Sequence, residues 1–92
     1  MIKEINDFGD ICYRFGDSHI QFWQSSPSPQ NNGGPCVTIC IKDKIYGDMD
    51  VVLNKAPLEM KEFIIHNLDM FAERSIMWDA DDLFKDMFGE MI

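Results

Sequence analysis

The sequence predicts an α+β fold with strands first and helices last: a four-stranded, mainly antiparallel sheet made of two hairpins, followed by one long helix and one short acidic C-terminal helix. Two observations predict this class. Apolar residues alternate with a period of two before residue 54, and near residue 57 the period changes to that of a helix. The 92 residues suffice for one modest core, so we expect a single domain over 1–92.

The first hairpin is predicted over 11–23. Apolar and polar residues alternate over 11–15, a turn sequence occupies 16–18, and β-favouring residues follow over 20–23. Phe22 and Trp23 are adjacent, so in a strand they point to opposite faces. We expect one of them in the core and the other, taken as Trp23, exposed as a contact residue unless the second helix covers it.

The second hairpin is predicted after a flexible loop. Residues 25–35 hold only Pro, Ser, Gln, Asn and Gly, which favour turns and bury no apolar surface. Alternation resumes over 36–41, a polar turn occupies 42–44, and a second strand is expected over 45–53 with Gly47 as a candidate bulge.

The helical part begins at Pro57, a residue suited to the first helical position. A helix is predicted over 57–76, with a buried stripe formed by Met60, Ile64, Leu68 and Phe71 and widened by Ile65 and Ala72. Its polar side carries Glu62, His66, Asp69 and Glu73. A shorter helix is predicted after Asp79, which is a suitable N-cap, and it ends near Gly89.

Charge is the strongest functional signal. The formal net charge is −8, and residues 57–92 hold nine acids against three bases. Such a field repels nucleic acid and anionic lipid and attracts basic surfaces, although acidity alone also serves solubility. Three cysteines, an odd number, do not suggest a disulfide framework, and no apolar run approaches membrane-spanning length. We therefore expect a cytoplasmic protein that binds neither membrane nor nucleic acid directly.

The sequence carries no recognisable catalytic or metal-binding motif. Cys36 and Cys40 are not spaced like paired zinc ligands, and the acidic stretches lack the pattern of a calcium loop. Glu62 and His66 stand four residues apart, as a solvated helical pair does. We expect no metal, no cofactor and no enzymatic activity, while a catalytic role for His66 or a cysteine stays a third alternative.

The C-terminal segment 78–92 combines five acids and one base with three large aromatic residues. Acids can steer a basic partner, and aromatic residues can anchor it. The alternative is that this helix closes the core. The predicted partner-binding residues are Trp78, Asp79, Asp81, Asp82, Phe84, Asp86 and Glu90, together with Glu62, Asp69, Glu73 and Trp23.

These observations favour a small acidic protein that inhibits a basic partner by occupying its cationic, nucleic-acid-binding surface. In size and charge such a protein compares with phage anti-defence proteins of the anti-CRISPR or anti-restriction type, whose partner would be a nuclease or another nucleic-acid-handling effector. A toxin-immunity protein is one alternative. Another is an adaptor subunit that inserts its C-terminal amphipathic helix into a groove.

Overall fold

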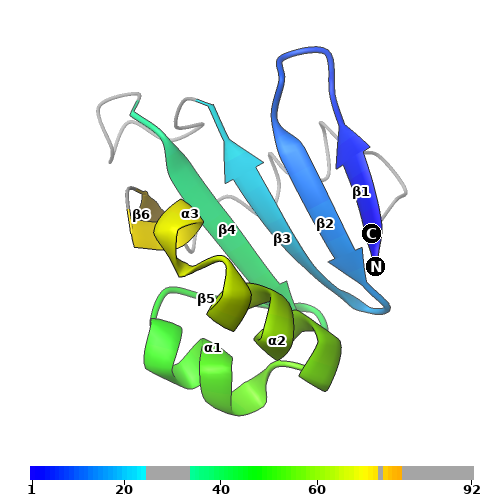
Figure 1. Ribbon diagram of the computed structural model, residues 1–92, viewed down its shortest axis with the longest axis vertical. Coiled ribbons are helices and arrows are strands. Elements are labelled where there is room, and N and C mark those ends of the chain that lie inside the picture. Colours follow the sequence, from blue (N-terminus) through cyan, green and yellow to red (C-terminus); the bar gives the residue numbers. More distant parts are fainter. Residues whose placement is uncertain (25–33, 73, 78–92) are drawn as a thin grey trace.

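The structure, a computed structural model, describes residues 1–24, 34–72 and 74–77. These residues form one mixed sheet and three helices (Figure 1). The elements follow in the order β1 (Ile2–Ile5), β2 (Ile11–Phe15), β3 (Ser18–Trp23), β4 (Cys36–Ile41), β5 (Lys44–Tyr46), α1 (Met49–Lys55), α2 (Leu58–His66), α3 (Leu68–Ala72) and β6 (Ser75–Met77).

The sheet is built around β4. Strands β1, β2, β3 and β4 are successive antiparallel neighbours. The other edge of β4 is divided between two short strands: β5 pairs antiparallel with Ile39–Ile41, and β6 pairs parallel with Cys36–Thr38. Strand β4 is therefore paired along both of its edges.

The predicted class is confirmed: an antiparallel sheet is followed by helices, and the first hairpin forms where it was predicted. Two strands, β1 and β6, were not predicted. In strand β1 both Ile2 and Ile5 are exposed. The strand therefore lacks the alternation of buried and exposed residues by which the other strands were predicted. Strand β1 pairs with β2, and Glu4 of β1 forms an ion pair with Arg14 of β2 at 3.4 Å.

The predicted strand over 45–53 is wrong beyond Tyr46, because helix α1 begins at Met49. Asp48 caps this helix: its Oδ1 accepts the Asp50 backbone N–H at 2.9 Å. The core-facing residues of this helix, Met49, Val52, Leu53 and Ala56, follow helical spacing, and Val52 is fully buried. Gly47 lies in the connection between β5 and α1 and is not a bulge.

The predicted long helix over 57–76 is interrupted. Asn67 ends α2, since its backbone N–H donates to the Ile64 carbonyl at 3.1 Å and its side-chain amide donates to the Phe63 carbonyl at 2.8 Å. Helix α3 restarts at Leu68, and the chain then becomes strand β6 rather than more helix. Asn readily competes for backbone hydrogen bonds in this way.

The principal core lies between the sheet and the helices, which cover one of its faces in Figure 1. An aromatic group joins the two layers. Phe63 of α2 lies 4.5 Å from Tyr13 and 5.5 Å from Phe15 between ring centroids, and Phe71 of α3 lies 5.2 Å from Phe22. Such tilted and edge contacts add to the burial of apolar area.

The opposite face of the sheet is buried as well, and it is richer in sulfur and polar groups. Its buried residues are Cys12, His19, Gln21, Trp23, Cys36, Thr38 and Cys40. Trp23, which was expected to be exposed unless the second helix covers it, is buried: its side chain is 1% exposed, and its Nε1 donates to Thr38 Oγ1 at 2.9 Å. The buried indole N–H obtains the partner that such a group requires.

Candidate functional site

Two of the predicted partner-binding residues lie on described helices and face solvent. Glu62 of α2 and Asp69 of α3 are both exposed. Eight others lie outside the described residues, as do the expected helix after Asp79 and most of the loop over 25–35. These eight are Glu73, Trp78, Asp79, Asp81, Asp82, Phe84, Asp86 and Glu90.

Apolar residues accompany these carboxylates on the outer side of the helices. Leu58 is 70% exposed, Ile65 is 52% exposed and Leu68 is 49% exposed. Leu58, Glu62 and Ile65 are separated by four and three residues, a spacing that places them on one side of α2. We define the outer helical surface as Leu58, Glu59, Glu62, Ile65, Leu68 and Asp69.

Sequence reasoning missed the apolar part of this surface, because it placed Ile65 and Leu68 in the buried stripe. Met60, Ile64 and Phe71 of that stripe are indeed buried. Ile65 is one residue beyond Ile64 and so is turned away from the sheet, and the break at Asn67 removes Leu68 from the continuous helical register. Asn67 was the available signal for this break.

The carboxylates on the outer helical surface differ in their electrostatic surroundings. Glu59 forms an ion pair with the Met1 ammonium group at 2.6 Å. Within the described part of the chain, neither Glu62 nor Asp69 has a cationic group within 4.0 Å. His66 is exposed, but it forms no ion pair with Glu62. Two negative charges thus face water without neutralisation by a described cation.

The three cysteines lie in strands β2 and β4 of the sheet. All three are buried. Burial raises the pKa of the Cys12 thiol from about 9 to about 12, an effect that nearby Arg14 partly opposes. Cys12 is therefore protonated at neutral pH. Over residues 1–24, 34–72 and 74–77, no cluster of three potential metal ligands occurs.

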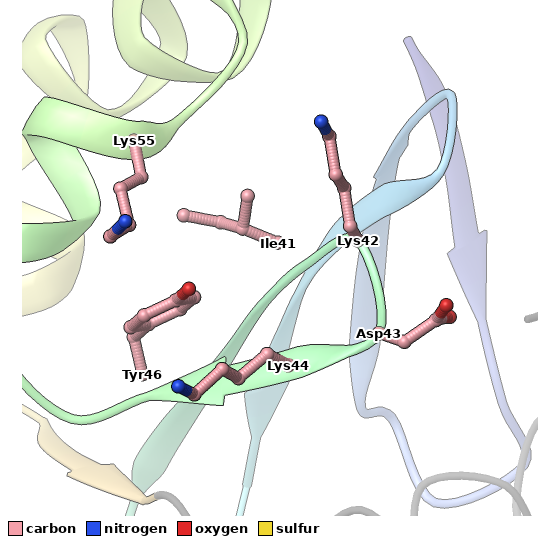
Figure 2. Close-up of a pocket in the computed structure, with 6 residues that line it drawn as sticks. All are labelled: Ile41, Lys42, Asp43, Lys44, Tyr46 and Lys55. Carbon is pink, nitrogen blue, oxygen red and sulfur yellow. The ribbon is translucent and has the colours of Figure 1, made fainter.

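A surface pocket of about 470 Å³ lies between the β4–β5 turn and α1. It is lined by Ile41, Lys42, Asp43, Lys44, Tyr46 and Lys55 (Figure 2). Three lysines thus line one pocket in a chain whose formal charge is −8. Sequence reasoning missed this pocket because a strand over 45–53 leads Lys55 away from the turn, whereas α1 brings it back. Asp48 as a helix cap was the overlooked signal.

The geometry defines the molecule as an α+β domain with an acidic, partly apolar helical surface and a separate cationic pocket. No helix in the described ranges combines the length and the hydropathy needed to cross a bilayer. Comparisons with protein-family models, with curated proteins and with solved structures yield no match.

Proposed function

We propose that this protein is a small, non-enzymatic binding protein that docks its outer helical surface on a basic surface of a partner protein. The observation that supports this proposal is the exposure of three large apolar side chains beside unneutralised carboxylates on α2 and α3. Contiguous apolar surface rimmed by polar groups is characteristic of interaction sites.

The two kinds of residue have different roles in such an interface. Leu58, Ile65 and Leu68 supply apolar area that a partner would remove from water. Glu62 and Asp69 supply charge that attracts lysines and arginines during approach and favours basic partners over acidic ones. Because neither carboxylate is engaged by a described cation, no internal ion pair has to break when the partner binds.

The proposed partner is a nucleic-acid-handling effector such as a nuclease, and the proposed effect is inhibition. Carboxylates that occupy the positions of phosphates compete with nucleic acid for a cationic groove. The net charge of −8 supports this version. Phage proteins that block bacterial defence, of the anti-CRISPR or anti-restriction type, act as such inhibitors, as do toxin-immunity proteins.

The alternative proposal is an adaptor subunit held mainly by apolar contacts in a partner's groove. The exposed Leu58 favours it, since a 70% exposed leucine can act as an anchor. Ionic strength distinguishes the two proposals. A complex held by charge weakens steeply as salt rises, whereas a complex held by apolar burial changes little.

The test begins with capture of partners from native cells, identification of the captured protein and measurement of its Kd at low and high salt. The double variant Glu62→Lys/Asp69→Lys reverses two charges on the outer helical surface. The matched control, Asp7→Lys/Asp17→Lys, makes the same change in net charge at two exposed aspartates outside this surface. Apolar contacts are tested with Leu58→Ser/Ile65→Ser.

We expect charge reversal on the outer helical surface to weaken binding about tenfold or more, and the control to change Kd by less than about threefold. Equal effects of the two charge-reversal variants would show that only overall charge matters and would refute this docking surface. Loss of binding only in Leu58→Ser/Ile65→Ser, with no salt dependence, would favour the adaptor.

A further inference from the structure

We propose that the pocket between the β4–β5 turn and α1 binds a phosphate dianion, either free or as a monoester of a small molecule. This site is separate from the outer helical surface: it shares no residue with it and takes a ligand of opposite charge to the proposed basic partner. Its success or failure is therefore independent of the proposed function.

The charge of the pocket is the first argument. Its lining carries three lysines and one aspartate, a formal net charge of +2, within an acidic chain. No carboxylate among the described residues lies within 4.0 Å of the ammonium groups of Lys42, Lys44 or Lys55. In Figure 2 the Asp43 carboxylate points away from Tyr46 and Lys55. The three ammonium groups thus have no described counter-charge within ion-pair distance, and an anion in the pocket would supply one.

The backbone positions of Lys42 and Lys44 are fixed by hydrogen bonds and by strand pairing. The Lys42 backbone has φ of 48°, a conformation that a residue with a side chain seldom adopts. It is held there because its N–H donates to Ser18 Oγ at 3.1 Å and its carbonyl accepts from Cys40 Sγ at 3.7 Å. Lys44 is fixed by β5 pairing with β4, opposite Ile41.

Lys55 reaches the same pocket from the last turn of α1. In Figure 2 its side chain extends from the helix toward Tyr46, and Lys44 approaches that ring from the strand. The Lys44 ammonium lies 5.6 Å from the Tyr46 ring centroid. Two segments that are separate in the sequence therefore present cations to one space.

The chemistry of the lining favours phosphate over a single carboxylate. A phosphomonoester carries nearly two negative charges at neutral pH and several acceptor oxygens, which matches several lysine donors and a formal charge of +2. The volume of about 470 Å³ exceeds what one phosphate needs, and Ile41 and the Tyr46 ring give the remaining space an apolar boundary. An organic substituent on the phosphate has room there.

The experiment uses the full chain labelled with ¹⁵N and follows its amide NMR signals during titration. Inorganic phosphate and adenosine monophosphate are titrated separately, and sodium chloride at equal ionic strength is the reference. We expect both phosphates to shift the amides of Lys42 and Lys44 in a saturable way. A lower Kd for adenosine monophosphate assigns the site to organic monoesters, and equal values assign it to free phosphate.

The variants Lys44→Gln and Lys55→Gln test the cations at two exposed positions, where substitutions usually change stability little. Lys3→Gln is a matched control, because Lys3 is an exposed lysine that lies over Tyr13 at 5.9 Å, much as Lys44 lies over Tyr46. Each pocket variant is expected to weaken phosphate binding about tenfold, and Lys3→Gln to leave it unchanged. Shifts equal to those with chloride, or equal Kd values in all three variants, would overturn the proposal.

Discussion

Individual polar side chains determine how the strands of this sheet are connected. In the β1–β2 loop, Asn6 Oδ1 accepts the backbone N–H groups of Phe8 and Asp10, each at 3.0 Å. The Asp10 carboxylate accepts the Gln24 backbone N–H at 2.7 Å and the Asn6 side-chain amide at 3.2 Å. Asp10 is 4% exposed, so these bonds join the beginning of β2 to the end of β3 away from bulk water.

We predict that Asp10→Ala lowers the free energy of unfolding by about 2 kcal/mol, because it leaves donors near the protein interior without an acceptor. Urea denaturation measures this change. Asp7→Ala is the control: Asp7 is exposed in the same loop, and its replacement is expected to change stability by less than about 0.5 kcal/mol. Similar losses in both variants would contradict the role of the buried carboxylate.

Burial of the Cys12 thiol makes the free energy of unfolding depend on pH in the alkaline range. Its thiol pKa rises from about 9 when unfolded to about 12 in the native protein, because burial disfavours the thiolate. The native state thus retains a proton that the unfolded state loses. The contribution of the protonated thiol to the free energy of unfolding is fully present below pH 9. It is lost as pH rises toward 12, at about 1.4 kcal/mol per pH unit.

The measurement is the difference in unfolding free energy between the native sequence and Cys12→Ala as a function of pH. We expect the advantage of the native sequence to be constant below pH 9 and to shrink above it. Contributions that are common to both proteins cancel in this difference. A pH-independent difference would show that the buried thiol does not resist ionisation.

Residue-level patterns predicted which side chains share a sheet face, but not whether each face is covered. Alternation over 11–15, 20–23 and 36–41 is a local property of extended backbone, so it was predicted correctly. The burial of Trp23 depends on packing over the second face, which alternation within one strand does not report. The exposure of Leu68 was not predictable from helical spacing alone, because the helix breaks at Asn67.

At the level of elements, the main error concerned α1. Residues 49–53 satisfy both periods, and the cap at Asp48 favours the helix, since its side chain accepts the Asp50 N–H and Asp50 lies in the positive first turn. Ala56 then donates its N–H to Val52 at the other end. Formation of helix α1 also creates the cationic pocket, because the helix places Lys55 beside the β4–β5 turn.

We predict that Asp48→Ala destabilises the protein by about 1 kcal/mol, the usual effect of losing an N-cap. Asp48→Asn is the control, because asparagine caps helices about as well as aspartate while removing the charge. Thermal denaturation followed by circular dichroism measures both variants. If Asp48→Asn were as destabilising as Asp48→Ala, charge rather than capping would explain the effect.

For the whole molecule, the composition determines the net charge, and the fold determines where the charged side chains lie on the surface. The net charge of −8 implies repulsion within the compact state, which dissolved salt screens. The acidic outer helical surface was predicted in part, from Glu62 and Asp69. Its apolar members and the cationic pocket were not, because they depend on where helices break and on which segments fold back together.

We predict that raising sodium chloride from low to physiological concentration increases the unfolding free energy by roughly 0.5 to 1 kcal/mol. Glu62→Gln/Asp69→Asn, which lowers the negative charge by two, is expected to gain less from salt. Denaturation at several ionic strengths measures both. A decrease in stability with salt would mean that attractive ion pairs outweigh the repulsion.

The divided edge of β4 has a consequence for biosynthesis. Strand β6 (Ser75–Met77) is synthesised after all the other described strands and helices. Until then, Cys36–Thr38 of β4 lack the strand that pairs with their outer edge. A nascent chain stopped before residue 75 presents an open β-edge to other chains. Early termination products of this gene should accordingly aggregate more readily than the complete polypeptide.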